Sequence, residues 1–281
     1  MSAVTNITTA AALKTLLGPK STATGAYYVR GEASGVGLLD LGAKSPDRLI
    51  VEFEDGWTWA GAAGSPNPAV AWHSRGVELY GGDVSNPHGG KVGVGGGDGV
   101  KVTDSSADGG TVGGRWWGLS IHDVAAQGFS SQANVYAHEL DADYETARCG
   151  LNIALDPHTE PGTGLHGSYI GGGSHPTTGR VKVYAHDQPT GSGVQVGAYA
   201  QNLALHITAA RMTWPKASAG AAFQPWGSHN TTVTVEFLGV DHAQYGIWAA
   251  SLSSGAVTVQ NYARSNVVHP DYLNSHVVIK P

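Results

Sequence analysis

Along most of the chain, small apolar residues alternate with polar or aromatic ones. In the segment RVKVYAHD at residues 180–187, two valines and an alanine point to one side, while Lys182, Tyr184 and His186 point to the other. The segment TVTVEF at residues 232–237 repeats this alternation. A period of two is typical of β-strands that are buried on one face. From residue 26 onward the sequence therefore predicts short β-strands separated by Gly-containing turns.

One helix is predicted, close to the N-terminus. Residues 8–19, TTAAALKTLLGP, contain a threonine N-cap, helix-forming Ala and Leu, and a Gly-Pro stop signal. Its apolar face is too small to support a domain, but it suits the end of a β stack, where unpaired strand edges invite aggregation. We therefore expect residues 1–24 to form a capping helix with a lead-in, and residues 25–281 to form one β domain.

Two recurrences indicate how the strands are arranged. The tetrapeptide VYAH occurs at residues 135–138 and 183–186, 48 residues apart, which equals two repeats of about 24 residues. In addition, a Val-x-Val strand, a turn and a second short aliphatic strand follow one another at residues 181–196 and again at 233–249. A β-sandwich explains the alternation but not a repeated tetrapeptide. The sequence therefore predicts an all-β solenoid in which parallel coils stack along one axis.

Several segments resemble a known family of this architecture. They are GVELYGGDVSNP at 76–87, GGDGVKV at 96–102, WGLSIHDVAAQGF at 117–129 and TVEFLGVDHAQYGIW at 234–248. They are similar to the coils of the right-handed, pectin-lyase-like parallel β-helix, in the Gly- and Ala-rich form found in tail and spike proteins of phages that infect actinobacteria. The resemblance implies this fold and a role as a minor tail protein in the virion, made in the host cytoplasm. It also implies a homotrimer that contacts other tail proteins.

Composition and charge narrow the possible partners. The chain of 281 residues has 41 glycines, 14% charged residues and a net charge of −6, and it has no run of Lys or Arg. Nothing here attracts a phosphate backbone, so we expect no nucleic-acid partner. Cys149 is the single cysteine, which excludes an intramolecular disulfide and a cysteine zinc cage. The sequence predicts no signal peptide, membrane insertion, metal or cofactor.

The predicted strands are interrupted by long segments rich in Gly, Pro, Ser and His. These predicted loops are residues 60–69, 85–98, 104–115, 157–179 and 215–230. In solenoids such insertions gather on one face, which is usually the binding face.

Histidines stand near the ends of several predicted strands. His122, His138 and His186 are each followed by an acidic residue, and His206 lies within a further strand. If they occupy equivalent places on successive coils, about 4.8 Å apart, they form a row that suits metal binding or proton transfer. The alternative is that His and Asp end the strands by hydrogen-bonding the following turn, and this alternative is favoured because such turns are common.

Acidic residues gather at positions 138–149, HELDADYETARC, which we interpret as a solvated acidic loop. Its spacing imitates the start of a calcium loop, but Thr146 stands where glycine is required. A carboxylate pair for glycoside cleavage is the functional alternative. The candidate catalytic acids are Glu139, Asp141, Asp187 and Asp241.

The signatures of enzymes on this fold are largely missing. Residues 164–167, GLHG, and 180–182, RVK, resemble two motifs of polygalacturonase-like hydrolases, but both aspartate motifs of that family are absent. Pectate-lyase-like signatures are absent as well. The comparison disfavours a hydrolase or lyase of either known type.

Aromatic residues supply a third set of candidates. Eight Trp and 11 Tyr stand against four Phe, a bias toward rings that stack on sugars while keeping a polar edge in water. Packing under loops or at a subunit interface is the alternative, and it is favoured for Trp57 and Trp59. The candidate glycan-binding residues are Tyr80, Tyr136, Tyr184, Trp214, Trp226, Trp248, His138 and His186.

These patterns favour a tail component that contacts a bacterial surface polysaccharide and needs no catalytic group. A depolymerase, either a glycoside hydrolase or a lyase, is the alternative on the same fold. A purely structural tail spacer is a third possibility, because function lies in loops and sites grafted on a scaffold.

Overall fold

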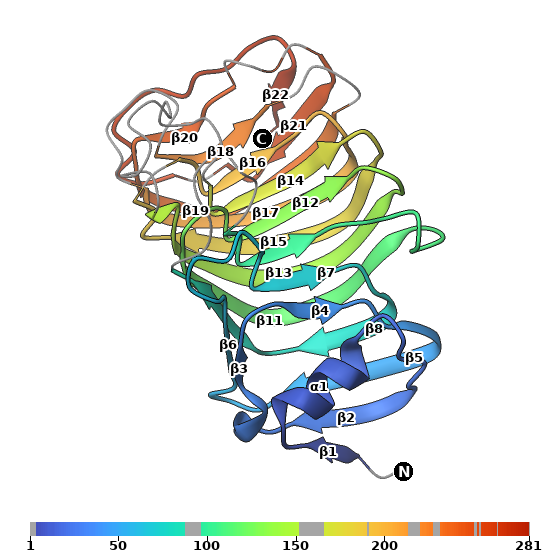
Figure 1. The fold of residues 1–281 in the computed structure, drawn as a ribbon. Coiled ribbons are helices and arrows are strands. Elements are labelled where there is room, and N and C mark those ends of the chain that lie inside the picture. Colours follow the sequence, from blue (N-terminus) through green and yellow to red (C-terminus); the bar gives the residue numbers. More distant parts are fainter. Residues whose placement is uncertain are drawn as a thin grey trace.

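The chain forms a right-handed parallel β-helix, in which each turn of the chain lies on the previous one (Figure 1). The computed structural model describes residues 4–87, 97–151, 166–189, 191–212, 220–226, 231–249, 252, 254–262 and 264–280, without the side chains of 46 and 47. All pairings between its strands are parallel, so the predicted stack of coils is confirmed.

Two sheets enclose the core. Sheet A contains, in spatial order, β1 (Thr5–Ile7), β2 (Gly25–Val29), β5 (Lys44–Phe53), β8 (Arg75–Tyr80), β11 (Val112–Val124), β13 (His138–Cys149), β15 (Thr177–His186), β17 (Ala200–Met212), β19 (Thr232–Ala243), β21 (Ala256–Gln260) and β22 (Val277–Ile279). Sheet B contains β4 (Leu39–Leu41), β7 (Val70–Trp72), β10 (Val100–Val102), β12 (Phe129–Ala133), β14 (Ser168–Gly173), β16 (Val194–Val196), β18 (Ala221–Pro225) and β20 (Tyr245–Ile247). Each complete coil therefore gives one long strand to sheet A and one short strand to sheet B.

The long strands of sheet A arise by fusion of two shorter ones. In the first coils a separate strand follows the main one: β3 (Gly35–Val36), β6 (Thr58–Ala60) and β9 (Asp83–Asn86). β11 pairs with β8 through its first half and with β9 through its second half, and the register shifts between Trp117 and Leu119. From β11 onward most coils therefore present a continuous bent strand to solvent, and this surface carries the site described below.

The core changes character along the axis. Trp57, Trp59, Trp72 and Trp116 are fully buried in the early coils, which confirms the structural role predicted for Trp57 and Trp59. Later coils are filled by Val, Leu, Ile and Ala, as the alternation predicts. Each such buried aliphatic side chain contributes roughly 2 kcal/mol through the hydrophobic effect.

The predicted helix is α1 (Ala10–Leu17), and it packs near the N-terminal end of the stack (Figure 1). The Thr9 side chain accepts a hydrogen bond from the Ala12 amide, which caps the first turn. Leu13, Leu16 and Leu17 are buried against the β-helix. Within the described residues, no helix is long and apolar enough to cross a membrane.

The repeated tetrapeptide that predicted stacking does not occupy equivalent positions. Val183 lies within β15 and pairs with Tyr144, whereas Val135 lies in a bend before β13 and is exposed. The recurring pattern at 181–196 and 233–249, in contrast, traces the passage from sheet A to sheet B in two coils. The argument from the tetrapeptide was therefore wrong, although the architecture it supported is correct.

The segment 138–149 was also misassigned. It is not a loop but the strand β13, which pairs with β11 on one side and β15 on the other. Its acidic residues alternate with buried Leu140, Ala142 and Tyr144, so they point outward from the sheet. Several predicted loops likewise contain strands of sheet B, notably β14 and β18.

Candidate functional site

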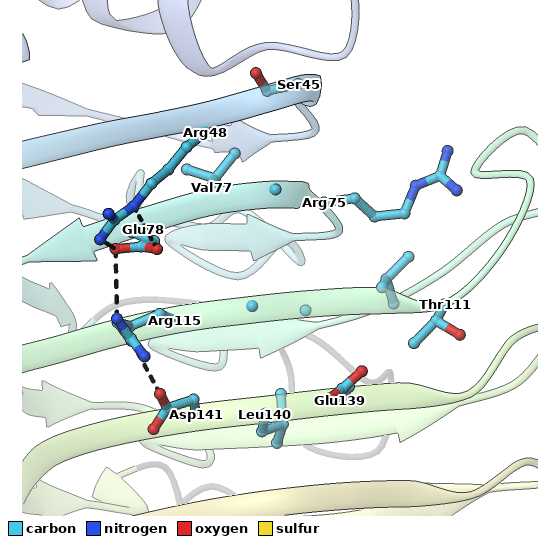
Figure 2. A pocket seen from close by; sticks show the side chains of 14 residues that line it. Ser45, Arg48, Arg75, Val77, Glu78, Thr111, Arg115, Glu139, Leu140 and Asp141 are labelled. Carbon is cyan, nitrogen blue, oxygen red and sulfur yellow. Dashed lines mark hydrogen bonds and ion pairs between the residues drawn. The ribbon is translucent and has the colours of Figure 1, made fainter. Parts of the chain in front are cut away.

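Charged side chains of opposite sign form a row across the outer face of sheet A. Glu78, Arg115, Asp141 and Arg180 are register partners on β8, β11, β13 and β15. Asp141 accepts hydrogen bonds of 2.9 Å from both arginines. Arg115 also lies 3.4 Å from Glu78, and Figure 2 shows its contacts with both carboxylates. Arg48 extends the row with a bidentate contact to Glu78 at 2.6 and 2.7 Å. Opposite charges on neighbouring strands stabilise the sheet.

The ion pairs fix the protonation of this row. Partial burial by itself raises the pKa of Asp141, but hydrogen bonds from Arg180, Arg115 and Trp117 together lower it. The Arg48 guanidinium is the main cause that lowers the pKa of Glu78. Both carboxyl groups are therefore anionic at neutral pH.

A large cavity on this face lies at the start of the same strands. Its volume is about 590 Å³, and it is bounded by β5, β8, β11 and β13. Figure 2 shows Arg75 at one side and Glu139 at another. The floor contains Gly113 and Gly114.

A second row, two residues further along each strand, has a different composition. Trp117, Asp143, Lys182, His206 and Glu236 are register partners on five successive strands, β11 to β19. Lys182 donates to Asp143 at 3.0 Å, and Nδ1 of His206 lies 3.0 Å from Glu236. Trp117 also packs edge-on against Tyr80, at 6.1 Å between ring centroids.

A small cavity of about 240 Å³ opens within this second row. Arg180, Lys182 and His206 line it together with Trp117 and Asp143. Among the described residues, Glu236 is the polar partner of the His206 ring, and it binds Nδ1. The Nε2 atom of His206 is therefore left available, in a cavity that also holds two cationic side chains.

Tyr184 separates two further hollows on the same face. One, of about 260 Å³, is shared with Lys182, Asp143 and Glu145. The other, of about 450 Å³, extends toward Arg264 over a floor of small residues in β17 and β19. The ring of Tyr184 stacks on His186 at 4.5 Å between centroids. Lys182 and Tyr184 thus lie at the centre of a chain of connected hollows.

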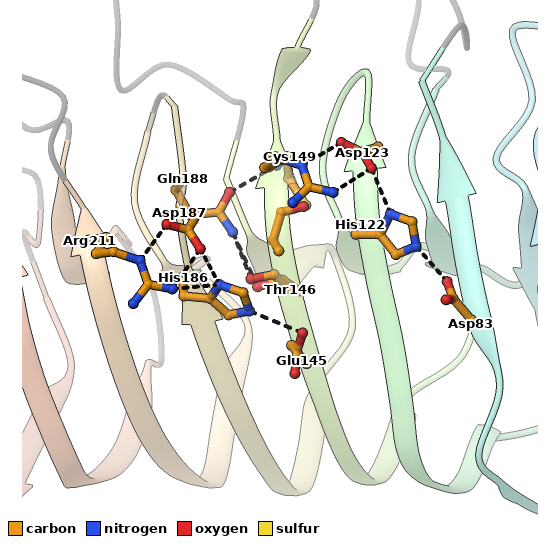
Figure 3. Close-up of polar contacts among 12 residues, drawn as sticks. Asp83, His122, Asp123, Glu145, Thr146, Cys149, His186, Asp187, Gln188 and Arg211 are labelled. Carbon is orange, nitrogen blue, oxygen red and sulfur yellow. Dashed lines mark hydrogen bonds and ion pairs between the residues drawn. The ribbon is translucent and has the colours of Figure 1, made fainter. Parts of the chain in front are cut away.

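Two similar ion-pair relays lie at the corner where sheet A ends (Figure 3). In the first, His122 contacts Asp83 at 2.7 Å and Asp123 at 2.8 Å, and Asp123 binds Arg148. Asp123 and Arg148 both adopt a left-handed backbone conformation, with φ of 50° and 49°. The first relay is therefore defined as Asp83, His122, Asp123 and Arg148.

The second relay repeats this arrangement two coils further on. His186 contacts Glu145 at 3.0 Å and Asp187 at 2.6 Å, and Arg211 binds Asp187. Asp187 and Arg211 are again left-handed, with φ of 51° and 56°. The second relay is therefore Glu145, His186, Asp187 and Arg211.

The contacts within the relays shift the pKa values of their members strongly. The hydrogen bond to Asp83 is the main cause that raises the pKa of His122 to about 9, despite partial burial. Arg148 is the main cause that lowers the pKa of Asp123 to about 2. Arg211 likewise holds the pKa of Asp187 well below its usual range. These groups are therefore charged at neutral pH, and their ion pairs connect neighbouring coils at the corner of sheet A.

The row of four histidines, which was the less favoured interpretation of the sequence, does not form. His122 and His186 occupy equivalent positions, separated by Ala147 on β13. His138 is fully buried and bonds Ser131 at 2.8 Å, and burial lowers its pKa to about 4, so the prediction that it faces outward was wrong. His206 lies in the second row, near the middle of its strand.

The four candidate catalytic acids lie at different places. Glu139 borders the large cavity, and Asp141 is held between two arginines. Asp187 belongs to the second relay. Asp241, on β19, bonds Ser265 and Asn266, and these contacts lower its pKa to about 2. Asp187 and Asp241 therefore have structural partners in the described part of the chain.

The aromatic candidates do not gather into one platform. Tyr80 and Tyr184 lie on the outer face of sheet A. Tyr136 lies in the bend before β13, where its amide is bound by Asp104, so its prediction as an outward strand residue was wrong. Trp226 follows β18 and is 41% exposed, and Trp248 packs against Tyr245 and Tyr272 near the C-terminal end. Trp214 lies outside the described residues.

The sequence interpretation missed the pairing that defines the site. Lys182 was correctly placed on the outer face but was given no role, and Glu236 was noted only for its alternation. The available signal was their outward position, since the register that joins Lys182, His206 and Glu236 depends on loop lengths. Of the GLHG segment, residues 164 and 165 lie outside the described residues; His166 is buried, and its Nδ1 accepts a hydrogen bond from the Ser192 amide.

No group of three or more potential metal ligands occurs among the residues that the structure describes.

Comparisons with known proteins agree with the fold. No protein-family model matches the chain, and no curated protein matches its sequence. Among solved structures, the chain is similar to the crystal structure of an alginate lyase from Paenibacillus sp. str. FPU-7. The TM-score is 0.51 with 11% sequence identity, and the match covers 98% of this chain and 99% of the lyase chain. This likeness establishes a shared parallel β-helix.

Proposed function

We propose that the protein is a polysaccharide lyase that cleaves an acidic polysaccharide by β-elimination on the outer face of sheet A. The observation that carries the proposal is the His206 ring, bound by Glu236 through Nδ1 and bordering one cavity together with Arg180 and Lys182. Removal of a proton next to a substrate carboxylate requires a base that is held in place and cations that neutralise that carboxylate. Glu236 holds the base, and Arg180 and Lys182 are the cations.

The reaction itself needs three functions. A base removes the proton on C5 of a uronic acid unit, whose carboxylate must be neutralised so that negative charge can develop on it. The electron pair then forms the C4–C5 double bond while the C4–O bond to the leaving sugar breaks. An acid donates a proton to the leaving oxygen. The atoms balance without an oxidant or a cofactor.

In the proposed assignment, Nε2 of His206 takes the C5 proton, and Glu236 fixes the ring and stabilises the imidazolium that forms. Lys182 and Arg180 neutralise the uronate carboxylate. Their protein partners, Asp143 and Asp141, hold the two cations in place before substrate binds. Such preorganisation is what makes electrostatic stabilisation effective.

Tyr184 is the proposed proton donor to the leaving sugar. It lies two residues from Lys182 on β15 and borders two hollows. A polysaccharide that occupies both hollows therefore places a glycosidic oxygen over the Tyr184 ring. Its hydroxyl interacts with Arg211, and its ring stacks on His186. Both contacts restrict the ring to one orientation.

A glycoside hydrolase is less well supported by the same face. Hydrolysis needs one carboxylic acid that remains protonated near neutral pH, which requires a raised pKa. Among the described residues, the pKa is lowered for the outward-facing Glu78, Asp123, Asp141, Asp187 and Asp241. Asp98, whose pKa burial raises, is almost fully buried. The likeness to an alginate lyase adds support for a lyase, at the level of the fold.

The test is an assay for unsaturated products. The protein is incubated with alginate, polygalacturonate and a neutral glucan, and the ultraviolet absorbance of the conjugated double bond is followed. We expect a signal from an acidic polymer, reduced by about 10²-fold or more in His206→Gln and Lys182→Met. Lys20→Met, which alters an exposed lysine on the lead-in, is the matched control and should retain full activity.

Two results would contradict the lyase. Reducing ends without unsaturation would indicate hydrolysis. Binding of polysaccharide without cleavage would favour the non-catalytic attachment role. The virion setting, the homotrimer and the contact with other tail proteins stay predictions from the resemblance.

A further inference from the structure

We propose that the large cavity between β5, β8, β11 and β13 is a second saccharide subsite that binds an acidic sugar unit through Arg75. This inference rests on the proposed lyase function, and it deepens that function by assigning how the polymer lies on the protein. Three independent features of the cavity support it.

The first feature is the floor of the cavity, which is made of backbone. A Cβ atom on Gly113 would lie 2.3 Å from the Glu139 carbonyl oxygen, and one on Gly114 would lie 2.9 Å from the Val77 carbonyl oxygen. Both glycines also have positive φ, of 118° and 134°. The two positions therefore require glycine, and the cavity of about 590 Å³ that they line is large enough for a sugar ring.

The second feature is the difference in ion-pair partners among the arginines around the hollow. Arg48 is bound to Glu78, and Arg115 is bound to Glu78 and Asp141. Arg75 differs, because its nearest acceptor within the described residues is the Gly109 carbonyl at 3.4 Å. Among the side chains that the structure describes, no carboxylate lies within ion-pair distance of Arg75. Its guanidinium can therefore bind an incoming carboxylate without breaking a contact, and bidentate geometry favours this.

The third feature is the mixture of charges. Glu139 borders the same cavity and has no hydrogen-bond partner within the described residues, while Asp141 and Glu78 are held by arginines. A free anion is repelled by these carboxylates. A sugar acid combines one carboxylate for Arg75 with several hydroxyl groups that donate to Glu139. The composition therefore fits an acidic sugar better than phosphate or sulfate.

The location of the cavity sets the direction of the polymer. Arg75 lies on β8, and Lys182 lies on β15, three strands further along sheet A. Neighbouring strands are about 4.8 Å apart, so the two cations are separated by about 14 Å along the axis. Lys182 is in register with Tyr80, which lies five residues beyond Arg75 on β8, so the two cations are also separated by about 16 Å along the strands. Trp117 lies on β11, between the two strands, and it offers aromatic surface for the intervening rings together with Tyr80, which packs against it. The polysaccharide then runs obliquely across the strands, from the large cavity to Tyr184.

The inference predicts a dependence on chain length that is specific to Arg75. A disaccharide of uronic acid is too short to reach from Lys182 to Arg75, whereas a hexasaccharide is long enough. In Arg75→Met we expect KM for the hexasaccharide to rise about tenfold, with unchanged kcat and unchanged cleavage of short substrates. Arg75→Lys should recover part of the affinity, because it keeps the charge but loses the bidentate geometry.

The control is Arg30→Met, which removes an arginine that is paired with Glu54 outside the cavity. Binding is also measured directly, by calorimetric titration of the hexasaccharide into the inactive His206→Gln variant, with and without Arg75→Met. A weaker binding only when Arg75 is removed supports the subsite. If the wild-type protein cleaves the polymer and Arg75→Met has the same KM at every chain length, the subsite is wrong and the lyase stands. If the wild-type protein neither cleaves nor binds acidic oligosaccharides, both proposals fail.

Discussion

The two relays at the corner of sheet A have the same contacts but different neighbours. In each, a histidine lies between two carboxylates, and the second carboxylate binds an arginine on the next coil. The difference lies two residues earlier on the strand, where the first relay has Ser120 and the second has Tyr184. Only Tyr184 stacks on its histidine. The relay is therefore a repeated element of the fold, and in the proposed mechanism the second copy gains a chemical role from Tyr184.

The corner itself explains why the relays recur. Asp123, Arg148, Asp187, Arg211 and His242 occupy successive places on the stack, and each has a positive φ between 49° and 56°. Left-handed backbone is unfavourable for residues with a Cβ atom. Alternating charge offsets part of this cost for the first four residues, because each of them meets an opposite charge on a neighbouring coil.

The largest expected effect is a difference in catalytic activity between variants of the two relay histidines, His186 and His122. His186→Gln removes the ring on which Tyr184 stacks, so the proton donor loses its orientation, and we expect kcat to fall by 10- to 100-fold with little change in KM. His122→Gln removes the equivalent ring beside Ser120 and should leave kcat unchanged. Initial rates with an acidic polymer across a range of pH provide the measurement.

A purely structural role for both relays makes a different prediction. In that case the two variants lose activity only in proportion to unfolded protein, and their pH profiles keep the wild-type shape. Equal loss of kcat in both variants, at equal stability, would remove the role assigned to His186.

A smaller effect concerns the alternating charges. Arg148 lies between Asp123 and Asp187, whereas Arg211 lies between Asp187 and His242. Arg148→Glu places a third carboxylate between two others, so we expect a loss of about 1 to 2 kcal/mol in the free energy of unfolding. Arg211→Glu should cost less, because one neighbour is a histidine. Urea denaturation of both variants checks the order, and an equal cost would show that the row does not act through charge.

The smallest effect is a pH dependence of stability from the first relay. Because the pKa of His122 is raised to about 9, from an ordinary value of 6.5, its contribution is fully present below pH 6.5. It is lost as the pH rises through 9. Since the ring is partly exposed, we expect the change to be on the order of 1 kcal/mol after solvent screening. The unfolding free energy, measured between pH 6 and 10, should fall less steeply in His122→Gln.

Most strands of sheet A were predictable, although β13 was interpreted as a loop, whereas β14 and β18 of sheet B were not. Sheet A alternates because one face is buried and the other meets solvent, as in β15. Sheet B is short and covered on both sides: every residue of β18, AAFQP, is buried, and β14 contains three glycines. A strand that is buried on both faces shows no period of two, so β18 resembles a loop in sequence.

The register between coils was hidden by unequal insertions. Val112 and its partner His138 are 26 residues apart, whereas His138 and its partner Thr177 are 39 apart. A fixed period therefore misaligned the histidines. It also concealed that Lys182, His206 and Glu236 share one row. The outward direction of Lys182 and Tyr184 was predictable from alternation, but that of the buried His138 was not, and neither were the neighbours across the coils.

Sheet A is built from repeated units that contact chiefly the units before and after them, and this gives the protein a modular length. The large cavity and the second row both include residues of β11 and β13, so the two sites share coils. The stacking of coils therefore fixes the distance between Arg75 and Lys182, and the length of the shortest oligosaccharide that contacts both residues would report that distance.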